Sequence, residues 1–264
     1  MKKSILIALL VAMLFFAIGN LSVLNARASA LCSLPFSSAL SASSVPSTEI
    51  SYLTLVNKSA PLSAGYVPPN LCKYNGIALH PIARDAFVKM LSDIESEKIY
   101  GLKLQSAYRS YSYQSAVFNQ RVKEVMAKGH TKYEAKIIAA KSVQPAGASE
   151  HQLGLALDVS IDGTLTPNFG ETLAGKWLAE NCHKYGFIIR YPESKTEITK
   201  IMYEPWHLRY VGEPHASIIK ELNMTLEEYW EFIKSIYAYV YWLPDGGYYK
   251  IFYQGSDIIT LLKP

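Results

Sequence analysis

The segment "GLALDVS", residues 154–160, puts an aspartate in the middle of an apolar stretch that is typical of a β-strand. Side chains alternate across a strand, so the two leucines and the valine face one side, and Asp158 faces the other beside the small Ala156. A carboxylate removed from water is strongly disfavoured unless a bound cation or an ion pair compensates it. Any fold that this chain adopts must therefore bring a positive partner to Asp158.

Two histidines are the candidate partners. His151 precedes Asp158, and Gly154 interrupts the strand between them, so this histidine can fold back over the carboxylate. His207 lies in "EPWHLRYVG", shortly after Glu204. A catalytic zinc ion takes three protein ligands from histidine and carboxylate and keeps a fourth position open for water. Either histidine–carboxylate pair alone favours a structural role, but together they favour a metal site on His151, Asp158 and His207.

Glu204 and Arg109 supply the remaining groups of a hydrolytic site. A carboxylate that is not a ligand, here Glu204, can take a proton from activated water and pass it to the leaving amine. Arg109 in "SAYRS" offers a permanent cation for a substrate carboxylate or a developing oxyanion. Its alternative role is a simple ion pair with an acid. The chain contains no G-x-S-x-G or H-E-x-x-H motif, so other hydrolase signatures do not compete.

The remaining histidines and the cysteines have simpler interpretations. We expect four histidines to be surface or hydrogen-bonded residues: His80, His130, His183 and His215. Cys182 falls in an apolar helical pattern and is predicted to be a buried, inert thiol. An oxidising compartment would permit one disulfide between Cys32 and Cys72, and the sequence leaves this pairing open.

The first thirty residues are typical of an export signal. "MKK" supplies a positive start, "SILIALLVAMLFFAIG" is uncharged and apolar, and "ARASA" ends in a small-x-small cleavage pattern. We expect cleavage after Ala30, with an uncleaved membrane anchor as the alternative. In both cases the bulk of the chain is predicted to lie outside the cytoplasm.

Charge and composition divide the rest of the chain. The formal net charge is +4, and three of the basic residues lie in the signal, so the remainder would carry about +1 and shows no nucleic-acid footprint. Residues 31–60 are predicted to be a Ser-rich tether and 61–222 the metal-bearing domain. Residues 223–264 are predicted to form an extension of one helix and an aromatic hairpin. Its tyrosines favour packing on the main domain, with glycan binding as the alternative.

The periodicity of apolar residues predicts an α+β fold, with a central, mostly antiparallel sheet, flanking helices and the metal site on the sheet. Helices are predicted over 82–98, 112–128, 131–142, 171–186, 214–222 and 225–236. Strands are predicted over 102–110, 155–160, 187–192 and 203–212, the last of them broken at Pro205.

Three segments resemble a known family. "SEHQLGLALD" is similar to the S-x-H-x-x-G-x-A-x-D motif of the VanY-type D-alanyl-D-alanine carboxypeptidases, which are zinc peptidases of the group that includes lysostaphin-like peptidases and the zinc domain of Hedgehog. "EPWHLRYVG" matches the family's E-P-W-H-x-R-Y-V-G segment, and "SAYRSYSYQ" looks like its arginine segment. The motifs follow the family order within residues 102–212.

The resemblance implies one zinc ion per chain, held by His151, Asp158 and His207. It implies that Glu204 is the catalytic base and that Arg109 contacts the scissile carbonyl or its oxyanion. Ser149 and Gln114 match positions that line the family's substrate pocket. Trp206 and Tyr210 are expected to shape this pocket, with structural packing beneath it as the alternative.

The implied function is that of an exported carboxypeptidase which removes the C-terminal D-alanine from peptidoglycan stem peptides, the D-Ala-D-Ala bond being the expected target. The alternatives are an L,D-carboxypeptidase or an endopeptidase acting on the same stem peptides, and a non-catalytic zinc-bearing module that binds the wall. The expected partners are stem peptides and no nucleic acid, with membrane contact only if the N-terminal segment is retained.

Overall fold

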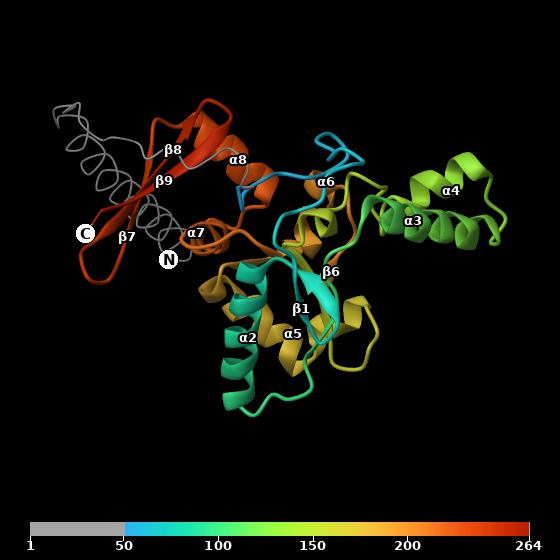
Figure 1. The fold of residues 1–264 in the computed structure, drawn as a ribbon, viewed down its shortest axis with the longest axis horizontal. Helices are drawn as coiled ribbons and strands as arrows, with labels where there is room; N and C mark the ends of the chain where they lie inside the picture. Colours follow the sequence, from blue (N-terminus) through green and yellow to red (C-terminus); the bar gives the residue numbers. More distant parts are fainter. Residues whose placement is uncertain (1–50, 264) are drawn as a thin grey trace, which may run out of the picture. The chain divides into compact units, whose positions relative to one another are not determined.

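A four-stranded antiparallel sheet forms the centre of the computed structural model, which describes residues 51–263 (Figure 1). In order across the sheet, the strands are β3 (Lys103–Ser106), β4 (Ala156–Ser160), β6 (Glu204–Tyr210) and β5 (Phe187–Tyr191). Every residue of the two central strands is buried. The α+β class with an antiparallel sheet, predicted from the apolar patterns, is confirmed.

The register of the two central strands brings the predicted ligands together. Asp158 on β4 lies directly opposite His207 on β6. Directly opposed residues share one face of a sheet, so both side chains point to the same side. Leu157 and Val159 of β4, and Leu155 just before it, belong to the main core on the other side. The alternation inferred for this strand is therefore confirmed.

The predicted break at Pro205 is wrong. β6 runs without interruption from Glu204, and the pairing of β5 with β6 shifts register between Ile189 and Tyr191 instead. Proline has no N–H to donate, so it disturbs the ladder locally, and the strand accommodates it by an irregular register rather than by ending.

Helices cover the core face of the sheet. Phe87, Met90 and Ile94 of α2 (Pro81–Ser96) and Leu178 of α5 (Leu173–Asn181) are fully buried in the cluster that contains Leu157 of β4. These apolar residues recur with helical spacing, which is why the sequence predicts both helices. The remaining short elements are β1 (Cys72–Tyr74), β2 (Ile77–Leu79), α6 (Thr196–Thr199) and the 3₁₀ helices η1 (Glu150–Leu153), η2 (Pro167–Glu171), η3 (Cys182–Tyr185) and η4 (Glu193–Lys195).

Helices α3 (Tyr111–Met126) and α4 (Lys132–Ala139) lie side by side as a helical hairpin (Figure 1). A small apolar cluster of their own joins them. Thr131 and Glu134 form a capping box that starts α4. The hairpin begins immediately after Arg109, so α3 carries side chains toward the metal-site face of the sheet.

The C-terminal part contains α7 (His215–Glu221), α8 (Leu226–Ser235) and a sheet of β7 (Tyr239–Trp242), β8 (Tyr248–Gln254) and β9 (Asp257–Lys263). The predicted hairpin is present, and β9 adds a third strand that was not predicted. Ile251 and Ile258 of this sheet pack with α8 in a second buried cluster. Tyr239 and Tyr241 join that cluster, as the packing interpretation expected. Figure 1 shows α8 beside β8.

Residues 51–60 are packed against the domain, although they fall within the predicted tether. Leu53 and Val56 are buried, and Trp230 Nε1 donates a hydrogen bond of 2.7 Å to the Leu53 carbonyl. Arg209 donates to the carbonyl of Tyr52. This segment packs on the domain because its apolar side chains, Leu53 and Val56, are removed from water there. The predicted signal over 1–30, the tether over 31–50 and Cys32 lie outside the described residues.

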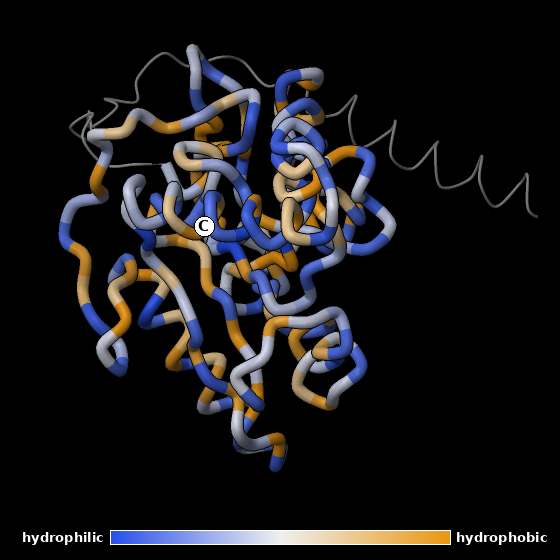
Figure 2. Tube along the Cα trace, turned by 90° about the vertical axis from the view of Figure 1, so that its right-hand side faces the viewer, coloured by the Kyte–Doolittle hydropathy of each residue, from blue (hydrophilic) through white to orange (hydrophobic). Residues whose placement is uncertain are grey.

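Among the described residues, the two cysteines Cys72 and Cys182 carry free thiols. Burial raises the pKa of the Cys182 thiol to about 12, which keeps it protonated and inert, as expected. Figure 2 shows short apolar and polar stretches interleaved along residues 51–263, and no helix in this part of the chain is long and apolar enough to cross a membrane.

Candidate metal centre

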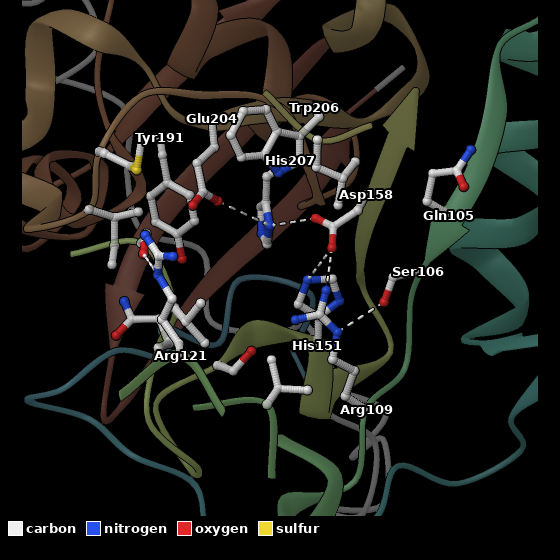
Figure 3. Close-up of a pocket in the computed structure, with 18 of the residues that line it drawn as sticks. Gln105, Ser106, Arg109, Arg121, His151, Asp158, Tyr191, Glu204, Trp206 and His207 are labelled. Carbon is white, nitrogen blue, oxygen red and sulfur yellow. Dashed lines mark hydrogen bonds and ion pairs between the residues drawn. The ribbon is translucent and has the colours of Figure 1, made fainter. Parts of the chain in front are cut away.

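The two histidines meet at the carboxylate of Asp158 (Figure 3). His151 Nε2 lies 3.2 Å from Asp158 Oδ2, and His207 Nδ1 lies 3.1 Å from Asp158 Oδ1. One ligand atom from each residue can be chosen so that all three lie within 4.8 Å of one another. The three side chains are buried.

The loop before β4 fixes the orientation of His151. The 3₁₀ helix η1 carries this histidine, and Gly154 ends it with a φ of +70°, a left-handed conformation. A Cβ at Gly154 would also approach Leu71 Cδ2 to 3.0 Å and His80 N to 3.2 Å. His151 Nδ1 faces the Ala107 carbonyl, which can only accept, so Nδ1 carries the hydrogen. His151 Nε2 is therefore left with a lone pair that points into the cluster.

The protonation states of His151 and His207 bear on whether a metal cation can bind here. Burial lowers the pKa of His151 to about 4, so this imidazole is neutral at pH 7, as a metal ligand must be. Burial would lower the pKa of His207 too, but the hydrogen bond to Asp158 and the nearby carboxylate of Glu150 outweigh it and raise this pKa to about 9. Without a metal, a protonated His207 is one positive partner of Asp158, and the guanidinium of Arg109 is another. Two imidazoles and one carboxylate are the donor types that zinc prefers, so the residues fit one zinc ion.

Glu204 lies beside this set without belonging to it. Its Oε2 is 3.8 Å from His207 Nδ1, and its side chain is almost completely buried. Burial raises the pKa of Glu204 to about 8, with His207 opposing and Asp158 adding to this rise. A carboxyl that titrates near neutral pH can both accept and donate a proton during turnover.

Arg109 reaches the cluster from the loop after β3. Its Nη2 contacts Asp158 Oδ2, so the structure contains the acid pairing that the sequence left as an alternative. Its Nε donates to Ser106 Oγ at 2.9 Å, and its Nη1 donates to Gln114 Oε1 at 3.4 Å. Gln114 in turn donates to the Gln144 carbonyl at 2.7 Å. These contacts hold the guanidinium at the metal site.

A pocket of about 600 Å³ opens over the cluster. All eight residues proposed from the sequence line it: His151, Asp158, His207, Glu204, Arg109, Ser149, Gln114 and Trp206. The lining residues that were not proposed include Arg121, Tyr191 and Met202. Arg121 lies on the helix predicted over 112–128, shortly after Arg109. A second cation so close to the arginine segment could have identified it as a pocket residue. Tyr210 packs in the core, away from the pocket.

Glu150, Arg190 and Arg209 were also missed. All three are almost completely buried, and they form an ionic cluster behind His207. Arg190 and Arg209 each stand in an apolar strand, in "FIIRY" and "HLRY". This is the same signal, a charge in a buried strand, that singled out Asp158.

Comparison with known proteins gives relatives that are described as carboxypeptidases. Residues 76–213 match the VanY family, described as D-alanyl-D-alanine carboxypeptidase. The carboxypeptidase candidate YodJ of Bacillus subtilis (strain 168) is 42% identical over 197 residues, covering 70% of this chain and 68% of that protein. A D-alanyl-D-alanine carboxypeptidase of Enterococcus faecium is 40% identical over 170 residues, covering 63% of this chain. The chain spans about half of the length of that enzyme, 48%.

Solved structures are similar as well. A VanY D,D-pentapeptidase variant from a VanB-type resistance cassette, in complex with Zn(II), is 37% identical with a TM-score of 0.62, covering 69% of this chain and 99% of that one. VanYB in complex with D-alanine-D-alanine is 37% identical with a TM-score of 0.63 and the same coverage. The LD-carboxypeptidase LdcB is 39% identical with a TM-score of 0.61, covering 68% of this chain and 86% of that one.

The family match covers just over half of the chain and includes the whole His–Asp–His cluster, Glu204 and Arg109. One similar structure contains Zn(II), and one similar protein is a D-alanyl-D-alanine carboxypeptidase. The chain therefore belongs to the VanY family of zinc-dependent D-alanyl-D-alanine carboxypeptidases.

Proposed function

We propose that this protein hydrolyses the D-Ala-D-Ala bond at the end of peptidoglycan stem peptides and releases the terminal D-alanine. One observation carries the proposal: the ligand atoms of His151, Asp158 and His207 lie within 4.8 Å of one another, and the non-ligand carboxyl of Glu204 borders them in the same pocket. A relative of this fold binds D-alanine-D-alanine, which supports the choice of substrate.

Zinc held by His151, Asp158 and His207 would polarise the scissile carbonyl and acidify a water molecule. Glu204 acts as the proton carrier in this proposal. Its carboxylate accepts a proton from the attacking water and donates it to the amine nitrogen as the carbon–nitrogen bond breaks. In the metal-free protein burial raises the pKa of Glu204 to about 8, so its carboxylate takes up a proton readily.

The arginines match the negative charges of the reaction. Arg109, at the edge of the cluster, stabilises the charge that develops on the carbonyl oxygen. Arg121 on α3, with a partly exposed side chain, offers a second cation in the same pocket for the free carboxylate of the substrate. Ser149, Gln114 and Trp206 shape the pocket around the terminal residue.

Hydrolysis of an L,D bond is the second candidate. LdcB, an LD-carboxypeptidase, is about as similar to this chain as VanYB is. Both activities use the same cluster and differ only in the residue that precedes the terminal D-alanine, so the shape of the pocket decides between them.

We also propose that the enzyme works outside the cytoplasm, after export by residues 1–30, because its substrate class is part of the cell wall. The catalytic unit proposed over 61–222 would then act together with residues 51–60 and 223–264, which pack on it. The interface through α8 supports this grouping.

Replacing Glu204 with glutamine tests the assignment. The zinc content of the variant, measured after dialysis, should stay near one ion per chain, because Glu204 is not a ligand. Its kcat on a pentapeptide stem should fall by about 10²- to 10⁴-fold. Turnover close to that of the wild type would overturn the proposed role of Glu204.

A further inference from the structure

Glu150, the residue before the ligand His151, is held on one side by two arginines. Arg190 Nε lies 2.7 Å from Glu150 Oε1. Arg209 Nη1 lies 2.8 Å from the same oxygen, in an ionic contact that lacks hydrogen-bond alignment. All three side chains are almost completely inaccessible to solvent. The carboxylate therefore has a fixed orientation, with one oxygen fully used.

The other oxygen of Glu150 faces His207. Within residues 51–263, Glu150 Oε2 has no hydrogen-bond partner, and neither has His207 Nε2. These two buried atoms lie 3.8 Å apart. Buried polar atoms rarely stay unpaired, so an acceptor and a ring nitrogen left over side by side indicate a contact that is nearly made. His207 turns its other nitrogen, Nδ1, toward Asp158.

Helix α8 reaches the same cluster from outside the segment that matches the family, residues 76–213. Glu227 on α8 binds Arg190 with both oxygens: its Oε1 lies 2.6 Å from Nη2, and its Oε2 accepts from Nη1 at 2.8 Å. This bidentate geometry is the strong form of an arginine–carboxylate pair. Asn57 donates to the Glu227 carboxylate at 3.3 Å. A line of ion pairs thus runs from α8 through Arg190 to Glu150, whose free oxygen faces His207 Nε2 at 3.8 Å.

The charges of this line balance. Two arginines face two glutamates, so the removal of one member leaves an uncompensated charge in a buried place. Because both arginines contact Oε1 of Glu150, its Oε2 is left as a free acceptor.

We propose that Glu150 is a positioning residue for the metal ligand His207, and that Glu227 on α8 fixes Glu150 through Arg190. With Nδ1 of His207 directed to the metal, its Nε2–H donates to Glu150 Oε2 and fixes both the tautomer and the ring orientation. The C-terminal helix is then part of the metal site and not merely a packed appendage. This inference rests on the proposed zinc site.

The competing explanation is that the cluster only fastens α8 to the sheet. Such a role changes the stability of the fold and leaves the affinity for zinc alone. The zinc dissociation constant, measured by competition with a chromophoric chelator, separates the two, because a positioning role must appear in zinc binding itself. The Tm with and without zinc is the second readout.

Glu227→Gln is the mildest variant, because its side chain is 17% exposed and keeps its shape. We expect its zinc affinity to fall a few-fold and its zinc-induced rise in Tm to shrink. Glu231→Gln is the matched control: the same change on the same helix, at an exposed residue whose ion-pair partner within residues 51–263 is Lys234. Its zinc affinity should equal that of the wild type. Equal zinc affinity in Glu227→Gln and the wild type would overturn the role of α8.

In Glu150→Gln the amide oxygen should face the two arginines, so its NH₂ group replaces the proposed acceptor beside His207, and zinc affinity should fall by about 10- to 100-fold. If this variant does not fold, Arg190→Lys replaces it, since lysine keeps the charge but cannot hold two carboxylates in the planar geometry of a guanidinium. Unchanged zinc affinity in the folded variant would overturn the positioning role of Glu150. Zinc is the only probe in these measurements, so tight zinc binding without peptide hydrolysis would contradict the proposed function and leave this inference intact.

Discussion

Replacing Glu204 with glutamine should stabilise the metal-free protein at neutral and alkaline pH. Burial raises the pKa of Glu204 from 4.5 to about 8. Above pH 4.5 the carboxyl ionises in the unfolded chain, whereas in the folded protein it keeps its proton until about pH 8. The folded state therefore binds more protons across this window, and the free energy of unfolding falls as the pH rises. Glutamine has nearly the shape of the protonated carboxyl and does not titrate.

The size of the effect follows from the two pKa values. At about 1.4 kcal/mol for each pKa unit, the difference between 4.5 and about 8 corresponds to about 4 to 5 kcal/mol. The variant and the wild type should have similar stability near pH 4, and the variant should be more stable by this amount at pH 8.5. For a domain of this size, the Tm should differ by roughly 8–20 °C.

Thermal and urea denaturation between pH 4 and pH 8.5, in the presence of a chelator, would measure the difference. Comparing the two proteins at each pH cancels the groups that they share. Added zinc should shrink the gap, because a nearby cation favours the ionised form of Glu204. A gap that does not depend on pH, or a variant less stable than the wild type at pH 8.5, would refute the reasoning.

Three further perturbations have defined outcomes. Gly154→Ala forces a side chain into a left-handed φ of +70° with its Cβ 3.0 Å from Leu71 Cδ2, so urea denaturation should show a loss of about 1–3 kcal/mol. Arg109→Ala should lower the kcat on a pentapeptide stem by about 10²- to 10³-fold while circular dichroism stays native. Trp230→Phe removes the buried hydrogen bond to the Leu53 carbonyl, and should cost about 1–3 kcal/mol in stability without altering zinc affinity.

The metal ligands could be predicted from the sequence because a charged residue in a buried strand requires a partner of opposite charge. A carboxylate buried among leucines is unfavourable without a cation, and this requirement singles out Asp158 and the two histidines. The pairing that joins them could not be read from local pattern, since Asp158 and His207 meet only through the long-range register of β4 and β6. The prediction that they lie together rests on the need of zinc for three protein ligands and on the family motifs.

What escaped prediction has physical reasons. Arg190 and Arg209 are charges in apolar strands, as Asp158 is, but their partner Glu150 lies in the 3₁₀ helix η1, and local sequence does not show that this helix packs against them. Strand β9 is a nearly continuous apolar run without the alternation that indicates a half-buried strand. In residues 51–60, Leu53 packs in the cluster that contains α8 and Val56 packs in the main core, so their partners lie far along the chain.

Incubation of the purified protein with pentapeptide and tetrapeptide stems, with and without a chelator, tests the central claim most directly when the products are weighed by mass spectrometry. The proposed function predicts that the pentapeptide loses one terminal alanine, that the chelator abolishes this loss and that added zinc restores it. Shortening of the tetrapeptide alone would move the assignment to the L,D bond. A folded, zinc-loaded protein that shortens neither stem would contradict the proposed carboxypeptidase activity.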